Sequence, residues 1–134
     1  RMQEIDFEGQ PPIDSFGAGG FRISHDFHDG HLLLTPSGQV TWQVTPGALS
    51  LEDFASVLGG GASIDLLLVG MGAEIAPIPA PVRRAFDEAG IGIEAMSTGS
   101  ACRTYNVLLA EVISNFTRSH SSRQRRKINL ISKV

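Results

Sequence analysis

The sequence predicts one α/β domain of three layers, in which a central mixed β-sheet begins with antiparallel hairpins and carries about three helices. Short extended segments between glycine turns fill the first third of the 134-residue chain, and helix and strand patterns alternate after residue 50. A long apolar stripe then marks a final helix. With 42% hydrophobic and 19% charged residues, the composition is that of a globular protein. We place the domain at residues 1–117.

The turn residues in the first third of the chain are spaced as in a β-meander. Its turns are Gly17-Ala18-Gly19-Gly20, Asp29-Gly30 and Pro36-Ser37-Gly38. They separate four extended candidates, at residues 12–16, 21–24, 31–35 and 39–44. Trp42 lies between Val40 and Val44 on one face at the strand period of 2, so we expect it in the core.

Two helices and two strands are predicted in the middle of the chain. Ser50 followed by Asp53 is a helix start, which predicts a helix over 51–58 that ends at Gly59-Gly60-Gly61. Proline at the entry and Gly90 at the exit frame a second helix over 82–89. The apolar run 64–69 has the length of a buried strand, and we expect it to be the central one. Residues 91–96 form the next strand.

The third helix starts near Ser100 and is the clearest element of the sequence. Apolar residues recur there at helical spacing, as Ala101, Tyr105, Leu108, Leu109, Val112, Ile113 and Phe116. The segment 118–134 that follows is either a basic end without structure or a short terminal strand over 127–132. We expect the protein to stay folded without it.

Charge is divided unevenly along the chain. Residues 1–111 carry 14 acidic and 5 basic residues, whereas residues 112–134 carry 6 basic residues and no acidic one. Such a tail suits nucleic acid, anionic lipid or the acidic body of the same protein. Because no aromatic residue follows Phe116, base stacking has no support, and we expect no nucleic-acid partner.

The number of cysteines and the length of the apolar runs indicate the cellular compartment and whether the chain spans a membrane. A lone cysteine, Cys102, cannot form an intramolecular disulfide, which favours an intracellular, cytoplasmic protein. The longest strongly apolar run, 64–73, is about half of the roughly 20 residues that a spanning helix needs, so we expect no membrane span. Residues 1–8 resemble neither a secretory signal nor a transit peptide.

Polar chemistry concentrates at 96–106, where the predicted strand passes into the third helix. The segment contains the only cysteine and the only tyrosine of the chain. Ser97, Thr98 and Ser100 are all suitable N-caps. Arg103 and Asn106 share the helix side away from the apolar stripe, where they can bind an anion, a carboxylate or a partner backbone. A structural ion pair of Arg103 with Glu94 or Glu111 is the alternative.

Cys102 is the candidate nucleophile or redox thiol. The positive end of the helix and the guanidinium of Arg103 would both favour a thiolate. However, no histidine or acid within the motif is placed to act as its base, and cysteine is commonly a small buried side chain. We therefore assign no catalytic residue. The ligand or partner contacts that we expect are Ser97, Thr98, Cys102, Arg103, Thr104, Asn106, Gly70 and Gly72.

Two weaker patterns are not assigned to ligands. Gly70-Met71-Gly72 follows a buried strand as a dinucleotide-binding turn would, but the third glycine position is Ile75. We interpret these glycines as room for close packing beside the motif, and expect no cofactor. Among His25, His28 and His31, the spacing of three places His28 on the opposite face of an extended hairpin, so we expect no metal.

Several blocks of the chain resemble a known family. They are Ile13 to Gly17 with Gly19 to Arg22, then Leu68 to Ala73, and above all Gly90 to Thr98 running into Ala101 to Leu108. Together they look like the domain-of-unknown-function family that includes mitochondrial respiratory complex I assembly factor 3. The resemblance covers roughly residues 11–111 and implies a three-layer α/β fold. It implies no catalytic residue, and it ends after Glu111, where members usually continue into a final apolar strand.

Two hypotheses for function follow. The first is a non-enzymatic binding or assembly module that contacts a protein partner through residues 96–106; the resemblance places that partner in respiratory complex assembly. The second is a small-molecule enzyme or redox protein that uses Cys102 with Arg103. An enzyme requires Cys102 to be reachable and its pKa lowered, whereas an assembly module can bury it. Neither hypothesis specifies an oligomeric state.

Overall fold

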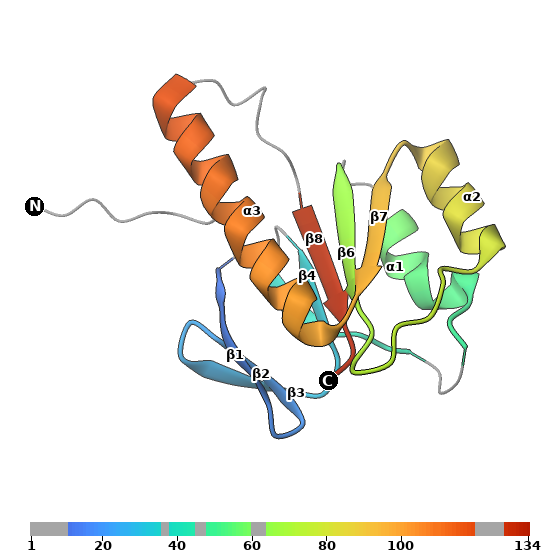
Figure 1. Ribbon diagram of the computed structural model, residues 1–134, viewed down its shortest axis with the longest axis horizontal. Helices are drawn as coiled ribbons and strands as arrows, with labels where there is room; N and C mark the ends of the chain where they lie inside the picture. Colours follow the sequence, from blue (N-terminus) through green and yellow to red (C-terminus); the bar gives the residue numbers. More distant parts are fainter. Residues whose placement is uncertain (1–10, 36–37, 45–47, 60–63, 120–127) are drawn as a thin grey trace, which may run out of the picture.

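The computed structural model describes residues 11–35, 38–44, 48–59, 64–119 and 128–134, with the backbone alone over 112–119. Its strands and helices follow one another along the chain as shown in Figure 1. The strands are β1 Ile13–Gly17, β2 Gly20–Ile23, β3 Asp26–Asp29, β4 Leu32–Thr35, β5 Gly38–Thr41, β6 Leu66–Gly70, β7 Gly92–Met96 and β8 Ile128–Ser132. The helices are η1 Leu51–Phe54, α1 Ala55–Leu58, α2 Ala80–Ala89 and α3 Thr98–Ser119.

Two sheets form the strand framework. The larger is mixed and has the order β5-β4-β8-β6-β7, with β6 parallel to both β8 and β7 and with β4 antiparallel to both β5 and β8. The smaller is antiparallel and has the order β1-β2-β3. The predicted fold class is therefore confirmed: a mixed sheet, antiparallel hairpins at the start of the chain, and helices packed on the sheet.

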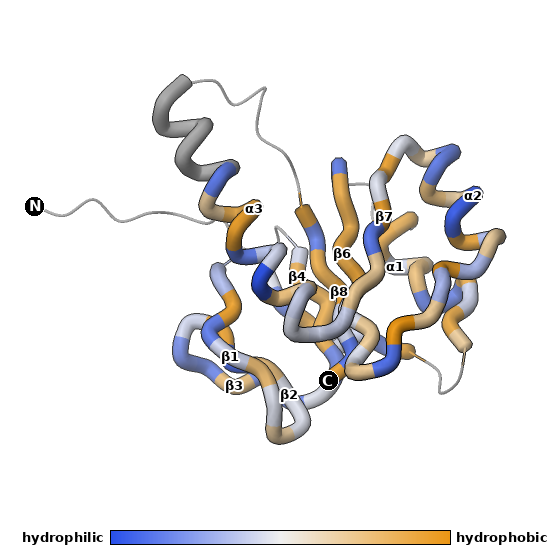
Figure 2. The backbone as a smooth tube through the Cα atoms, viewed as in Figure 1, coloured by the Kyte–Doolittle hydropathy of each residue, from blue (hydrophilic) through white to orange (hydrophobic). Residues whose placement is uncertain are grey.

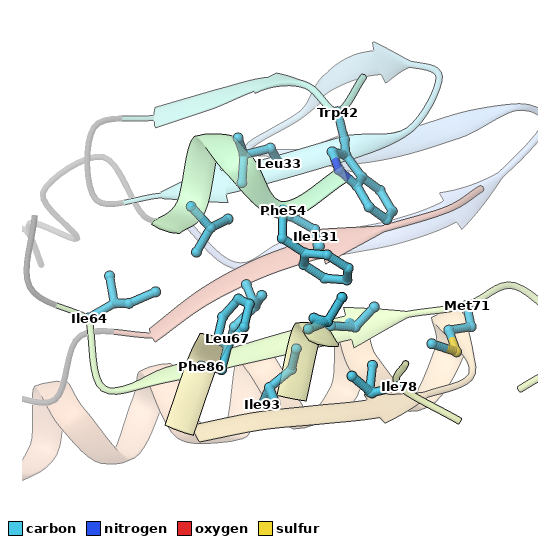
Figure 3. Packing of buried hydrophobic residues seen from close by; sticks show 13 residues of the cluster. Leu33, Trp42, Phe54, Ile64, Leu67, Met71, Ile78, Phe86, Ile93 and Ile131 are labelled. Carbon is cyan, nitrogen blue, oxygen red and sulfur yellow. The ribbon is translucent and has the colours of Figure 1, made fainter. Parts of the chain in front are cut away.

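The larger sheet separates two apolar clusters. Alternate residues of β8 serve the two sides, since Leu130 packs in one cluster with Tyr105 and Phe21, and Ile131 packs in the other with Phe86. The first cluster lies under α3 and the smaller sheet; the second lies under α2 and η1, and Figure 3 shows its side chains. Figure 2 shows the apolar character of β6 and β8 between these layers.

The position of the central strand differs from the prediction. The apolar run at 64–69 does form a strand, β6, but β8 occupies the centre of the sheet and every one of its residues is buried. Of the two alternatives for the segment 118–134, a terminal strand is the one that the structure contains. The sheet thus extends beyond residue 117, because Ile128, Leu130 and Ile131 supply the apolar side chains that both faces need.

Local signals placed the helix start at Ser50 and the helix end at Gly90 correctly, whereas α2 begins at Ala80 rather than at residue 82. The backbone N–H of Ser50 donates to the Asp53 carboxylate at 2.8 Å, as a capping box requires. Trp42 is buried, as expected, and its indole N–H donates to the Asp53 carbonyl at 2.8 Å. The predicted helix over 51–58 is a 3₁₀ turn followed by one turn of α1. At the end of α2, Gly90 adopts φ 75°, the left-handed conformation of a C-cap.

Other expectations are corrected or lie outside the described residues. β3 was not predicted, and α3 begins at Thr98 rather than near Ser100. No described helix has both the length and the apolarity needed to cross a membrane. The turn at 36–37, the glycines at 60–61, the basic cluster at 123–127 and the side chains of Val112, Ile113 and Phe116 lie outside the description.

Candidate functional site

Ser97 lies at the junction between β7 and α3 and accepts hydrogen bonds from the first turn of the helix. Its hydroxyl accepts the backbone N–H of Ser100 at 3.2 Å, and its carbonyl accepts the N–H of Ala101 at 2.9 Å. Ser97 is therefore the N-cap of α3, which leaves Thr98 inside the first turn. Of the three hydroxyl residues that could cap this helix, one does so.

Thr98 joins three chain segments at the carboxyl ends of the parallel strands. It is buried, its Oγ1 accepts the N–H of Gly72 at 2.9 Å and donates to the Lys133 carbonyl at 2.8 Å, and its own N–H donates to the Gly72 carbonyl at 3.1 Å. The hydroxyl of Ser132 lies 3.4 Å from Thr98 Oγ1. The hydroxyl of Thr98 thus holds the ends of β6 and β8 against the start of α3.

The two glycines beside this network are required by space and by backbone conformation. A Cβ at Gly70 would overlap the Ser132 side chain and lie 3.3 Å from the Ala101 Cβ. Gly72 has φ 75°, which L side chains rarely adopt. The observation at Gly70 agrees with the close-packing interpretation. Gly72 is required by its backbone conformation instead, since the atom nearest to its Cβ would lie 3.8 Å away.

Cys102 is buried in the cluster under α3. Its residue exposure is 5%, and burial raises the pKa of its thiol to about 11, with the nearby Arg103 guanidinium lowering it only in part. The lowered pKa that the enzyme hypothesis requires is therefore contradicted, because desolvation outweighs the effect of the Arg103 guanidinium. A neutral, enclosed thiol gives a nucleophile or redox role no support. Among the described residues, no cluster of histidine, cysteine and carboxylate side chains is arranged to hold a metal ion.

Tyr105 and Asn106 bind the start of the chain to α3. The buried Tyr105 hydroxyl donates to the Pro11 carbonyl at 3.3 Å. Asn106 Oδ1 accepts the N–H of Ile13, and its Nδ2 donates to the Ile13 carbonyl, both at 2.8 Å. The amide thus pairs with β1 as a neighbouring strand would. Its polar groups are engaged inside the fold rather than presented to a ligand.

Arg103 is the motif side chain that faces outward. It is exposed, its Nη2 lies 3.4 Å from Ser100 Oγ, and it forms no ion pair with the described residues Glu94 and Glu111. A Cβ placed on Gly99 would lie 3.3 Å from both the Arg103 Nη1 and the Phe16 ring. The guanidinium and the ring therefore both rest on Gly99.

Phe16 was not among the predicted site residues. It is 47% exposed, and the only sequence signal for it was its place in the first family-like block. We call Phe16, Gly99 and Arg103 together the Phe16–Arg103 surface. Thr104 lies beside it, half-buried, and Val107 is 58% exposed one turn further along α3.

The three histidines of the early segment have separate local roles. The backbone N–H of His25 donates to the Asp14 carboxylate at 3.0 Å. A ring nitrogen of His28 lies 3.1 Å from the His31 carbonyl, and the His31 ring accepts the N–H of Val134 at 3.1 Å. These contacts connect turns and the chain end.

Two proteins of known sequence are similar to most of this chain. A protein of Rhodobacter capsulatus with no assigned function is 39% identical over 109 residues, 81% of this chain and 83% of its own. Human NADH dehydrogenase (ubiquinone) 1 alpha subcomplex assembly factor 3 is 31% identical over 100 residues, 74% of this chain and 54% of its own. The chain thus spans about half the length of that assembly factor.

Solved structures share the whole architecture. A crystal structure described as an outer membrane protein from Bartonella henselae superposes with a TM-score of 0.78 at 34% identity, covering 96% of this chain and 98% of its own. The NMR structure of a Rhodopseudomonas palustris protein gives 0.71 at 31% identity, covering 98% and 90%. The family described as "Protein of unknown function (DUF498/DUF598)" matches residues 13–114. The match confirms the resemblance seen in the sequence, and the chain belongs to this family.

Proposed function

We propose that this protein is a non-enzymatic binding module that takes part in the assembly of a protein complex, and that the Phe16–Arg103 surface is its contact site. One observation carries the proposal. The polar groups of the junction are used within the fold, by Ser97, Thr98 and Asn106, while Arg103 and Phe16 are turned outward. What the Phe16–Arg103 surface offers to another molecule is therefore a cation beside an aromatic ring.

The chemistry of this pair suits a protein partner. Arginine and aromatic side chains are enriched at the centres of protein interfaces, where they supply buried area and directional hydrogen bonds. The long contact of Arg103 with Ser100, 3.4 Å, leaves most of its five N–H groups for a carboxylate or carbonyl of the partner. Gly99 lets both side chains lie low against the first turn of α3.

The class of partner comes from the relatives. Several vertebrate proteins of similar sequence are named as NADH dehydrogenase assembly factors. Because the chain spans only 54% of the human one, its own role in respiratory complex assembly is part of this proposal. We place that role inside the cell, where the single thiol, Cys102, stays reduced.

The test is a comparison of protein partners captured from the native host by wild type and by surface variants. Arg103→Ala and Phe16→Ser should each lose the same proteins, whereas Arg84→Ala, an exposed arginine on α2, should keep them. Circular dichroism of each variant checks that the fold is intact. The proposal also expects proteins of NADH dehydrogenase or its assembly among those lost.

Two results would overturn parts of it. Unchanged partners in both surface variants would remove the Phe16–Arg103 surface as the contact site. Captured partners that depend on Arg103 but have no connection with NADH dehydrogenase would keep the binding module and remove the respiratory role.

A further inference from the structure

Strand β7 forms an edge of the larger sheet and pairs on one side with β6 (Figure 1). The N–H of Gly92 donates to Asp65, before β6, and the carbonyl of Met96 accepts from Met71, after it. In a parallel ladder, alternate residues direct both backbone groups to the same neighbour. Gly92, Glu94 and Met96 therefore face β6, while the N–H and carbonyl groups of Ile93 and Ala95 face the open edge. Within the described chain, no other strand pairs with this edge.

A cavity of about 450 Å³ lies at this edge. It is lined by the loop residues 75–78, by Arg83 of α2 and by residues 93–95 of β7. Ile78 and Ile93 form part of its wall. Both belong to the apolar cluster on the α2 side, where Figure 3 labels them. Ile75 is 60% exposed beside it. An unpaired strand edge thus lies next to a recess that combines apolar side chains with the charged Arg83.

The two faces of β7 differ in chemistry at this edge. Ile93 and Ala95 pack on the α2 side, next to the apolar loop, whereas Glu94 is exposed and, by strand alternation, points to the other side. An added strand would place apolar side chains beside Ile93 and Ala95. Between them it would place one side chain beside the Glu94 carboxylate.

The negative charge of Glu94 favours some strands over others as partners for the β7 edge. A second copy of this chain, paired antiparallel about Glu94, would set two carboxylates opposite each other, which is destabilising. A charge on an edge strand is a common guard against such self-pairing. A partner strand that carries lysine or arginine at this position gains the opposite-charge pair instead.

We propose that the β7 edge binds an extended segment of a partner protein by strand addition, and that this segment has a basic residue flanked by apolar residues. Its backbone pairs with Ile93 and Ala95, its apolar side chains enter the recess beside Ile75 and Ile78, and its basic side chain pairs with Glu94. This edge shares no residue with the Phe16–Arg103 surface.

Two fluorescent peptides test the proposal by anisotropy, Thr-Val-Lys-Val-Thr and Thr-Val-Glu-Val-Thr. The lysine peptide should bind wild type about three- to ten-fold more tightly than the glutamate peptide, the range expected from a favourable against a repulsive cross-strand pair. Glu94→Lys should reverse this preference. Because the reversal requires a folded protein that still binds, loss of fold cannot imitate it.

A proline variant tests the backbone pairing separately. Ala95→Pro removes an N–H that faces the open edge and leaves the ladder with β6 intact, a position where sheets tolerate proline. It should weaken the lysine peptide by about ten-fold or more with an unchanged circular dichroism spectrum. Equal binding of both peptides, no binding of either, or binding unaffected by Ala95→Pro would overturn the proposal. A wild-type dimer that Ala95→Pro dissociates would assign the edge to a second copy and overturn it as well.

Discussion

The side-chain amide of Asn106 and the backbone of Ile13 form two hydrogen bonds of 2.8 Å across 93 residues of sequence. This pair joins the small sheet to α3, and Tyr105 extends it through the Pro11 carbonyl. The specific polar residues of the family-like motif therefore act first as connections within the fold.

Replacing Asn106 by leucine should destabilise the protein by about 2–4 kcal/mol, because it removes both partners of a part-buried N–H and carbonyl while keeping the volume. Urea unfolding followed by circular dichroism measures the change. Arg103→Ala, an exposed position on the same helix, should stay within about 0.5 kcal/mol of wild type. A cost at Asn106 no larger than at Arg103 would contradict the clamping role.

Thr98→Val should cost about 1–3 kcal/mol, because the shape of the side chain is kept while the bonds to Gly72 and Lys133 are lost. Thr98→Ser keeps the hydroxyl and should cost less. Thermal unfolding of the two variants gives the comparison. A larger loss in Thr98→Ser than in Thr98→Val would show that the methyl group, rather than the hydroxyl, is what the site needs.

Cys102 predicts a pH dependence. Burial raises the pKa of its thiol from 9.0 to about 11, so below pH 9 the thiol is neutral in both states and its contribution to stability is complete. As the pH rises from 9 to about 11, the unfolded chain ionises first, and stability is lost. The stability of the Cys102→Ala variant should decline less steeply with pH over this range. Tyr105, whose pKa is also raised by burial, acts equally in both proteins.

Sequence reasoning succeeded where the signals are local. Ser50 with Asp53 marked a helix start, and Gly90 marked the end of α2, because capping and left-handed turns depend on residues a few positions apart. Alternation alone also placed Trp42 in the core.

Long-range pairing explains what sequence reasoning missed. Nothing near Asn106 indicates that its partner is Ile13, so its amide was assigned to a ligand surface. β3 contains Asp26, His28 and Asp29, and such a polar composition does not predict a strand. The five residues of β8 follow a basic stretch, and only the sheet shows that they pair with β4 and β6.

This last difference reverses the expectation for the C-terminal segment. Removing residues 128–134 takes the central strand from between β4 and β6 and splits the larger sheet into two pairs. It also removes three buried side chains, Ile128, Leu130 and Ile131, each worth about 1.5–3 kcal/mol. The sum is comparable to the 5–15 kcal/mol that stabilises a typical domain. We therefore expect the truncated chain not to fold.

Circular dichroism and thermal unfolding of the truncated chain test this directly. Lys133→Ala is the matched control, because it changes a half-buried side chain beyond β8 and keeps the strand; it should unfold near the wild-type temperature. Leu130→Ala should lie between the two, with a loss of about 2–5 kcal/mol from the cavity that it leaves. A truncated chain with a cooperative, wild-type-like transition would show that β4 and β6 can close the sheet without β8.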